Sequence, residues 1–169
     1  AAVDAADPIR DIHVIRADLL PLHEVGALFN PDWLARIRDL RSLRFMDWMM
    51  TNGSPVQGWD DRPRLTDHTW TVWGAPLEVM IALANEVGAD PWFTLPHMAD
   101  DDYIRRFAET VKAGLDPRLK AHVEYSNEVW NHIFPQAGWA AAQAETLWGA
   151  SESGWIQFYG LRAAQVMDI

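Results

Sequence analysis

The chain has 169 residues, of which 49% are apolar and 22% charged, a composition typical of a globular domain that can bury a sizeable core. Its formal net charge of −10 argues against nucleic acid as a partner, because a phosphate backbone is bound through basic patches. No apolar run approaches the roughly 20 residues needed to span a bilayer, and the absence of cysteine excludes disulfides and thiolate zinc sites.

The N-terminal part of the sequence predicts one strand and one helix. Residues 12–16 (Ile-His-Val-Ile-Arg) alternate between apolar and polar side chains, as a strand does. Asn30 can act as the N-cap of a helix with Pro31 in its first turn. The apolar stripe of that helix comprises Trp33, Leu34, Ile37 and Leu40.

The middle of the sequence predicts two strands separated by a long loop and a helix. Residues 43–48 form the second predicted strand. Residues 49–74 lack periodicity and are rich in Gly, Pro, Asp and Trp, which predicts an ordered substrate-side loop. A helix then runs from 75 to about 87 and stops at Gly88, and residues 91–97 form the third strand.

The C-terminal half continues the alternation of helices and strands. Asp100 to Asp102 place carboxylates at the start of a helix, where they suit its dipole. Residues 120–128 form the fourth predicted strand, and Ala-rich helices cover about 135–147 and 155–166. Such alternation predicts a parallel sheet, and no strand is followed by a phosphate-binding glycine motif.

These elements predict an α/β fold of the TIM-barrel type, present as roughly half a barrel of about four strands in one domain over residues 1–169. Chemistry in such a fold lies at the C-terminal ends of the strands. Four polar residues end predicted strands: Asp47, His97, Asn127 and Glu128.

Glu128 has the properties of an acid that cleaves a glycosidic bond. Such cleavage needs one carboxylic acid to protonate the leaving oxygen and a second carboxylate on the other side of the sugar. Glu128 ends a buried strand and precedes Trp130 by two residues, and apolar surroundings of this kind keep an acid protonated. Asn127 can donate its amide to a sugar hydroxyl. Alternatively, Glu128 is a structural carboxylate that caps the following turn.

Residues 123–131 (Val-Glu-Tyr-Ser-Asn-Glu-Val-Trp-Asn) resemble the fourth-strand motif of clan A glycoside hydrolases, a retaining group that includes cellulases, mannanases and xylanases. In that clan an Asn-Glu pair closes the fourth strand, and the Glu is the acid/base. Arg44 is similar to an arginine placed beneath the active site, and His97 to a histidine that contacts substrate. The resemblance covers about residues 42–131.

The resemblance implies retaining hydrolysis of a β-linked polysaccharide of the cellulose or β-glucan type, without a cofactor, and favours an extracellular or periplasmic location. Ten tryptophans support sugar binding, since flat rings stack on sugar faces, although Trp also fills cores. The implied catalytic residue is Glu128. The implied substrate contacts are Asn127, His97, Arg44, Trp48, Trp130 and Asp47, together with the loop tryptophans Trp59, Trp70 and Trp73.

The clan places its nucleophilic Glu on a seventh strand, whereas this sequence predicts four. Three explanations remain open: the chain is a piece of a longer enzyme, half-barrels associate with each other or with the rest of a barrel, or the site binds sugar without cutting it. A further hypothesis is an interaction fragment whose unpaired strand edges bind another chain.

Other candidates for the site have structural alternatives. Glu124 lies four residues before Glu128 on the same strand face, which points toward the barrel interior. It is expected to pair there with Arg44, because a buried charge needs a partner. Asp47 is a candidate second carboxylate, but strand alternation places it opposite Arg44. His97 could bond to a loop instead of substrate. The remaining histidines show no metal-ligand spacing, and Ser126 lacks the nucleophile-elbow motif of a hydrolase.

Overall fold

The computed structural model describes residues 6–8 and 12–169. The chain divides into two compact units, residues 1–37 and 38–169. None of the helices in the described ranges is long and apolar enough to cross a membrane.

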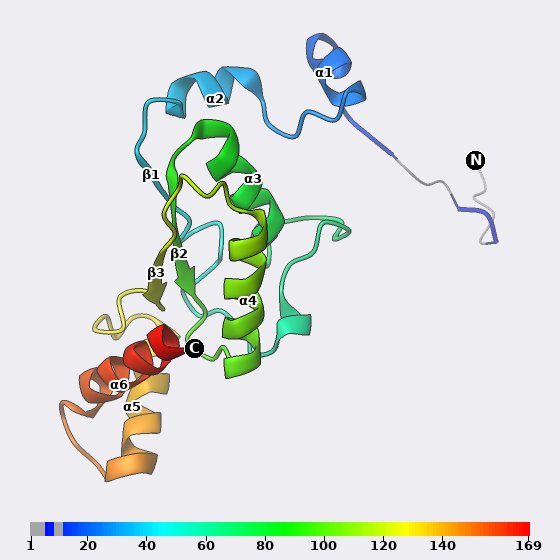
Figure 1. Cartoon of the computed structure of the whole chain (residues 1–169). Helices are drawn as coiled ribbons and strands as arrows, with labels where there is room; N and C mark the ends of the chain where they lie inside the picture. Colours follow the sequence, from blue (N-terminus) through cyan, green and yellow to red (C-terminus); the bar gives the residue numbers. More distant parts are fainter. Residues whose placement is uncertain (1–5, 9–11) are drawn as a thin grey trace. The chain divides into compact units, whose positions relative to one another are not determined.

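The first unit contains short helices: η1 (Ala17–Leu19), α1 (Leu20–Glu24) and α2 (Pro31–Ile37) (Figure 1). The predicted start of α2 is confirmed, because Asn30 Oδ1 accepts a hydrogen bond of 2.8 Å from the backbone N–H of Asp32.

The strand predicted at residues 12–16 is wrong, because these residues are irregular. Ile12 is 73% exposed and Val14 is 95% exposed, so no core covers the apolar side of the alternating pattern. Alternation makes a strand only where a neighbouring strand pairs with it and one face is buried.

The second unit is built on a three-stranded sheet in which all strands are parallel and follow the order β1-β2-β3. The strands are β1 (Ser42–Arg44), β2 (Asp90–Leu95) and β3 (His122–Tyr125). The register places Arg44 opposite Trp92 across the first pair. Parallel pairing was expected from the alternation of strands and helices.

The expectation of roughly half a TIM-type barrel with about four strands is wrong. The sheet has three strands in the part of the chain that the structure describes, and residues 12–16 supply no fourth. The second predicted strand is also too long, because residues 46–50 turn back and the Met49 N–H donates to the Phe45 carbonyl at 2.8 Å. Alternating elements predict parallel pairing but do not determine how many strands the sheet contains.

Two helices, α3 (Leu77–Val87) and α4 (Asp101–Gly114), pack side by side on one face of this sheet (Figure 1). Their ends follow the predicted signals. Gly88 ends α3 with a φ of +72°, a left-handed conformation that favours glycine. Asp100 caps α4 by accepting a hydrogen bond of 2.7 Å from the N–H of Tyr103. Beneath the helices, Phe93 of β2 is fully buried.

The last two helices, α5 (Pro135–Trp148) and α6 (Gly154–Asp168), form a hairpin beside the C-terminal end of the strands (Figure 1). Their contact is close, because the position of a Cβ on Gly154 would be 2.9 Å from Ala144 Cβ. Arg162 attaches α6 to the sheet end by donating a hydrogen bond of 2.9 Å to the carbonyl of Ala99.

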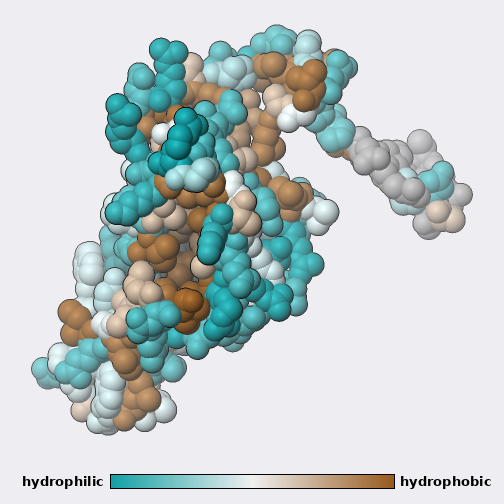
Figure 2. Space-filling view, viewed as in Figure 1, coloured by the Kyte–Doolittle hydropathy of each residue, from teal (hydrophilic) through white to brown (hydrophobic). Residues whose placement is uncertain are grey.

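An apolar groove of about 540 Å³ lies between α4, β3 and the end of α6. Its walls include Val111 of α4, Val123 of β3 and Val166 of α6. Figure 2 shows the corresponding hydrophobic band between the hydrophilic side chains of the second unit. This groove is on the helix-covered side of the sheet and contains none of the predicted site residues.

Candidate functional site

The turn that follows β3 has an unusual backbone. Ser126 and Glu128 adopt φ values of +60° and +44°, in the left-handed region that non-glycine residues rarely enter. Such a conformation costs about 1–3 kcal/mol per residue and persists only where surrounding contacts impose it. Asn127, between them, is 5% exposed and supplies those contacts.

Three side chains, those of Arg44, Asn52 and Gln136, fix Asn127 in place. Its Oδ1 accepts a hydrogen bond of 2.8 Å from Arg44, and its Nδ2 donates one of 3.0 Å to Asn52 Oδ1. Gln136 Nε2 donates to the same Asn52 oxygen at 2.7 Å and to the Asn127 carbonyl at 2.8 Å. Gln136 Oε1 in turn accepts from the N–H of Gly53 at 2.9 Å. The Asn127 amide is therefore held by the protein itself, and its contact with a sugar stays a prediction.

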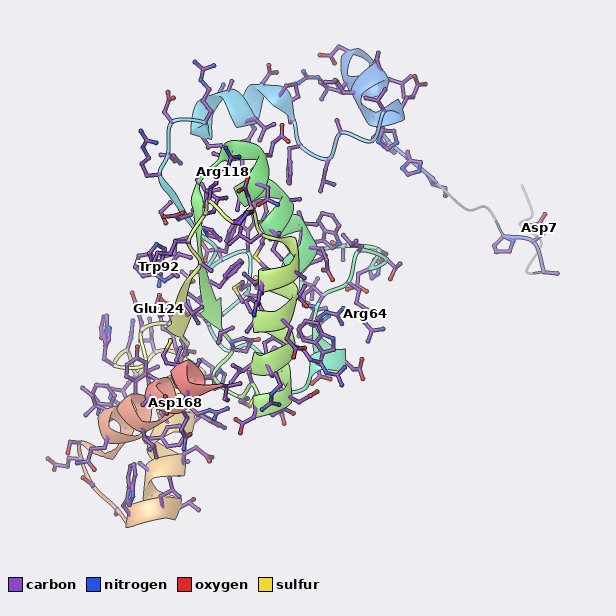
Figure 3. The ribbon with its side chains drawn as sticks, viewed as in Figure 1. Asp7, Arg64, Trp92, Arg118, Glu124 and Asp168 are labelled. Carbon is purple, nitrogen blue, oxygen red and sulfur yellow. The ribbon has the colours of Figure 1, made fainter. Side chains whose placement is uncertain are left out.

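Arg44 also forms the ion pair that the sequence predicted. Its Nη2 lies 2.8 Å and its Nε 3.3 Å from Glu124 Oε2, which confirms the pairing of these two residues. Trp92 Nε1 donates a third hydrogen bond of 3.0 Å to the same oxygen, and the Arg44 guanidinium lies 5.2 Å from the centre of the Trp92 ring. Figure 3 shows Trp92 and Glu124 on the side of the sheet away from α4.

Glu128 is exposed to solvent, and the apolar surroundings expected for it are not formed by the described residues. Its Oε2 accepts a hydrogen bond of 3.1 Å from Asn131 Nδ2, and its carbonyl accepts one of 2.8 Å from the Asn131 N–H. These contacts match the alternative in which Glu128 caps the following turn. Trp130, two residues later, is 61% exposed, so ring and carboxylate are both accessible to a solute.

His97 is buried between the sheet end and α5, with 4% of its surface exposed. Its ring lies 5.3 Å from the Trp139 ring, and its carbonyl accepts a hydrogen bond of 2.8 Å from the Tyr125 hydroxyl. Burial lowers the pKa of His97 to about 4, so the ring is neutral at pH 7. Its Nδ1 has no hydrogen-bond partner among the residues that the structure describes. His97 therefore packs against α5, and its predicted contact with substrate stays a prediction.

Asp47 and Trp48 lie in the turn after β1 instead of in a strand, so the alternation argument applied to Asp47 does not hold. Asp47 is exposed and its carbonyl accepts from the Met50 N–H at 3.1 Å. Trp48 packs against Phe45, with ring centres 5.6 Å apart. Gly74 passes so close to the Trp48 carbonyl that no Cβ would fit there.

The loop of residues 49–74 is irregular apart from η2 (Trp59–Asp61), as expected from its lack of periodicity. Its tryptophans have different surroundings. Trp59 packs against Tyr103 of α4 at 5.7 Å and stacks under the Arg62 guanidinium at 4.2 Å, so it serves the packing of the loop. Trp73 is 53% exposed and remains available to a ligand.

Two members of the network around Asn127, Asn52 and Gln136, were not predicted from the sequence to belong to the site. They lie 75 and 9 residues from Asn127 along the chain. Gln136 offered a weak signal, because it follows Pro135 at the start of a helix and is a polar residue on the buried side.

No family model, curated protein or solved structure matched the chain. Among the residues that the structure describes, no three His, Asp or Glu side chains gather into a possible metal site. The resemblance to clan A glycoside hydrolases accordingly depends on the motif at residues 123–131, with Arg44 and His97, and on nothing else.

Proposed function

We propose that the second unit carries a carbohydrate-processing site of the glycoside-hydrolase type, in which Glu128 is the acid/base. One observation carries the proposal: the turn after β3 holds two non-glycine residues in left-handed conformations and presents the Glu128 carboxylate to solvent. Strained backbone of this kind concentrates at catalytic and binding sites. The motif at residues 123–131 supplies the reaction class, retaining cleavage of a β-linked polysaccharide.

In this proposal Glu128 protonates the glycosidic oxygen as the bond breaks and then takes a proton from the incoming water. A general acid works best where its charged form is disfavoured, and Glu128 is exposed in the free protein. A sugar ring stacked on Trp130 would remove water from the carboxylate, so that the substrate itself completes the site. The proposal assigns the acid/base role and leaves the nucleophile unassigned.

An assay of soluble β-glucan hydrolysis tests this assignment. The reducing ends that are released measure the turnover. Replacing Glu128 with Gln keeps the shape of the side chain and its contact with Asn131 but removes the acid. Turnover should fall by about 10²–10⁴-fold, while binding to the glucan changes little. Glu145→Gln, at an exposed position on α5, is the matched control and should retain wild-type turnover. Equal turnover by the wild type and Glu128→Gln would remove Glu128 from the mechanism.

A second candidate function is sugar binding without cleavage. It is favoured by the exposure of several tryptophans in the second unit, since exposed rings are available for stacking: Trp73, Trp92, Trp130 and Trp148. A pull-down on insoluble cellulose, run beside the reducing-end assay, separates the two candidates. Retention of the chain on cellulose with no sugar released supports the binding function.

A further inference from the structure

A second hollow with polar and aromatic walls lies along β3, apart from the turn that carries Glu128. It has a volume of about 340 Å³, within the range of small-molecule sites, which is roughly 300–1,000 Å³. The sheet contributes Trp92, His122 and Glu124 to its wall, and α6 contributes Tyr159 and Met167. None of these residues was among the substrate contacts predicted from the sequence.

The hydrogen bonds of Glu124 leave one carboxylate oxygen available in this cavity. Oε2 accepts all three hydrogen bonds, two from Arg44 and one from Trp92. Oε1 accepts none from the described residues, and the side chain is 24% exposed. A carboxylate oxygen of this kind is a strong acceptor for a ligand hydroxyl, because hydrogen bonds to ionised groups are stronger than neutral ones.

The aromatic walls offer a surface for a ring. Trp92 is 39% exposed, and its position is fixed by the hydrogen bond to Glu124 and by the Arg44 guanidinium. Tyr159 packs against Tyr125, with ring centres 5.8 Å apart. An aromatic face held in one orientation binds the apolar face of a ligand with little loss of side-chain freedom.

The charges around the cavity select against an anion. Its wall contains the carboxylate of Glu124, and Asp90 lies 3.7 Å from His122. Arg44 is already bonded to Glu124 and Asn127. Burial, with a smaller contribution from the Glu124 charge, raises the pKa of Tyr159, so its hydroxyl keeps its proton and can donate at neutral pH.

We propose that this cavity binds one neutral pyranose unit, stacked on Trp92, whose hydroxyl groups bond to Glu124 and Tyr159. The inference rests on the proposed function for its choice of a sugar and adds a subsite to it. An amide or an alcohol without a ring would leave the Trp92 face uncovered, and a uronic acid would place a second negative charge beside Glu124.

Titration calorimetry of the whole chain with cellotetraose tests the subsite. Tyr159→Ala should raise the Kd about tenfold, and Tyr159→Phe, which keeps the ring and loses the hydroxyl, about threefold. Leu161→Ala, an exposed position on the same helix outside the cavity, is the control and should leave the Kd unchanged. Methyl β-glucuronide should bind at least about tenfold more weakly than methyl β-glucoside.

His122→Ala provides a second variant at an exposed position of the wall, should Tyr159→Ala fail to give the wild-type circular dichroism spectrum. A wild-type Kd for Tyr159→Ala, Tyr159→Phe and His122→Ala overturns the subsite, as does the absence of any binding of cellotetraose. Glu128→Gln, assayed for hydrolysis in parallel, keeps the two proposals separate. If the cavity variants bind more weakly and Glu128→Gln hydrolyses β-glucan like the wild type, the subsite is supported and the acid/base role is contradicted. If the cavity variants bind like the wild type and Glu128→Gln loses turnover, only the subsite is contradicted.

Discussion

Two adjacent residues of β2, Trp92 and Phe93, lie on opposite faces of the sheet, one exposed and one covered by helices. Phe93 points beneath α3 and α4, is fully buried and contacts Phe107 with ring centres 5.1 Å apart. Trp92, one residue earlier, points to the other face, is 39% exposed and bonds to Glu124. Since side chains alternate along a strand, one short strand supplies both the core and a polar surface. A change on the first face should therefore alter stability, and one on the second should alter ligand binding.

The largest effect is expected on the covered face. Phe93→Ala removes a fully buried ring and should lower the free energy of unfolding by about 3–5 kcal/mol. Urea denaturation followed by circular dichroism measures it. Trp92→Phe, on the exposed face, is the comparison and should cost much less. If Phe93→Ala and Trp92→Phe lowered the free energy of unfolding by similar amounts, the two faces of the sheet would contribute equally to stability.

Acidification should weaken the contact between the sheet end and α5. Burial lowers the pKa of His97 to about 4, below its unfolded value of about 6.5. The unfolded chain therefore binds the proton first, so stability is full above pH 6.5 and falls as the pH drops towards 4. The loss from this group is at most about 3 kcal/mol.

His97→Gln should remove that part of the pH dependence between pH 6.5 and 4. Urea denaturation at several pH values measures it, with His132→Gln at an exposed position as the control. A pH profile that is identical in the wild type and in His97→Gln would contradict the assignment.

The ion pair on the polar face should contribute less, because both partners are partly exposed. The side chains of Arg44 and Glu124 are 36% and 24% exposed, so solvent screens their attraction. We expect Arg44→Met to lower the free energy of unfolding by about 1–2 kcal/mol, including the bond that it removes from Asn127. A double-mutant cycle with Glu124→Gln should give a coupling of about 1 kcal/mol. Strict additivity would show that the pair contributes nothing.

The smallest change in stability is expected at the residue to which we assign catalysis. Glu128→Gln retains an acceptor for Asn131 and alters an exposed side chain, so the free energy of unfolding should change by less than about 0.5 kcal/mol. Thermal unfolding of the variant used in the hydrolysis assay measures it. A larger loss would favour the structural role, in which this carboxylate mainly caps its turn.

Local signals in the sequence predicted the helices of the second unit closely. The sheet could not be predicted in the same way, because each strand depends on pairing with a strand that is distant along the chain. Gly88 and Asp100 mark helix ends by their own conformation or side chain, so α3 and α4 could be placed from a few residues each. Residues 12–16 carried the right alternation for a strand, but a strand also needs a neighbour to pair with, and none of the described residues pairs with them. The number of strands in the sheet was therefore overestimated.

The site was predictable in part for the same reason. The Arg44–Glu124 pair followed from charge and strand face, because two charged residues on a surface that was expected to be buried need each other. The amides of Asn52 and Gln136 had no such requirement, since either could have been satisfied by water. The left-handed conformations at Ser126 and Glu128 also leave no mark in the sequence, because neither residue is glycine.

Gln136 has a consequence for the order in which the molecule assembles. Its amide group bonds to Asn52, 84 residues earlier, and to the carbonyl of Asn127. Contacts so distant along the chain close late, after local helices have formed. The turn at residues 126–128 can therefore reach its final conformation only when the first turn of α5 has packed against it. A chain that ends before residue 136 should leave the Glu128 side chain without a fixed position.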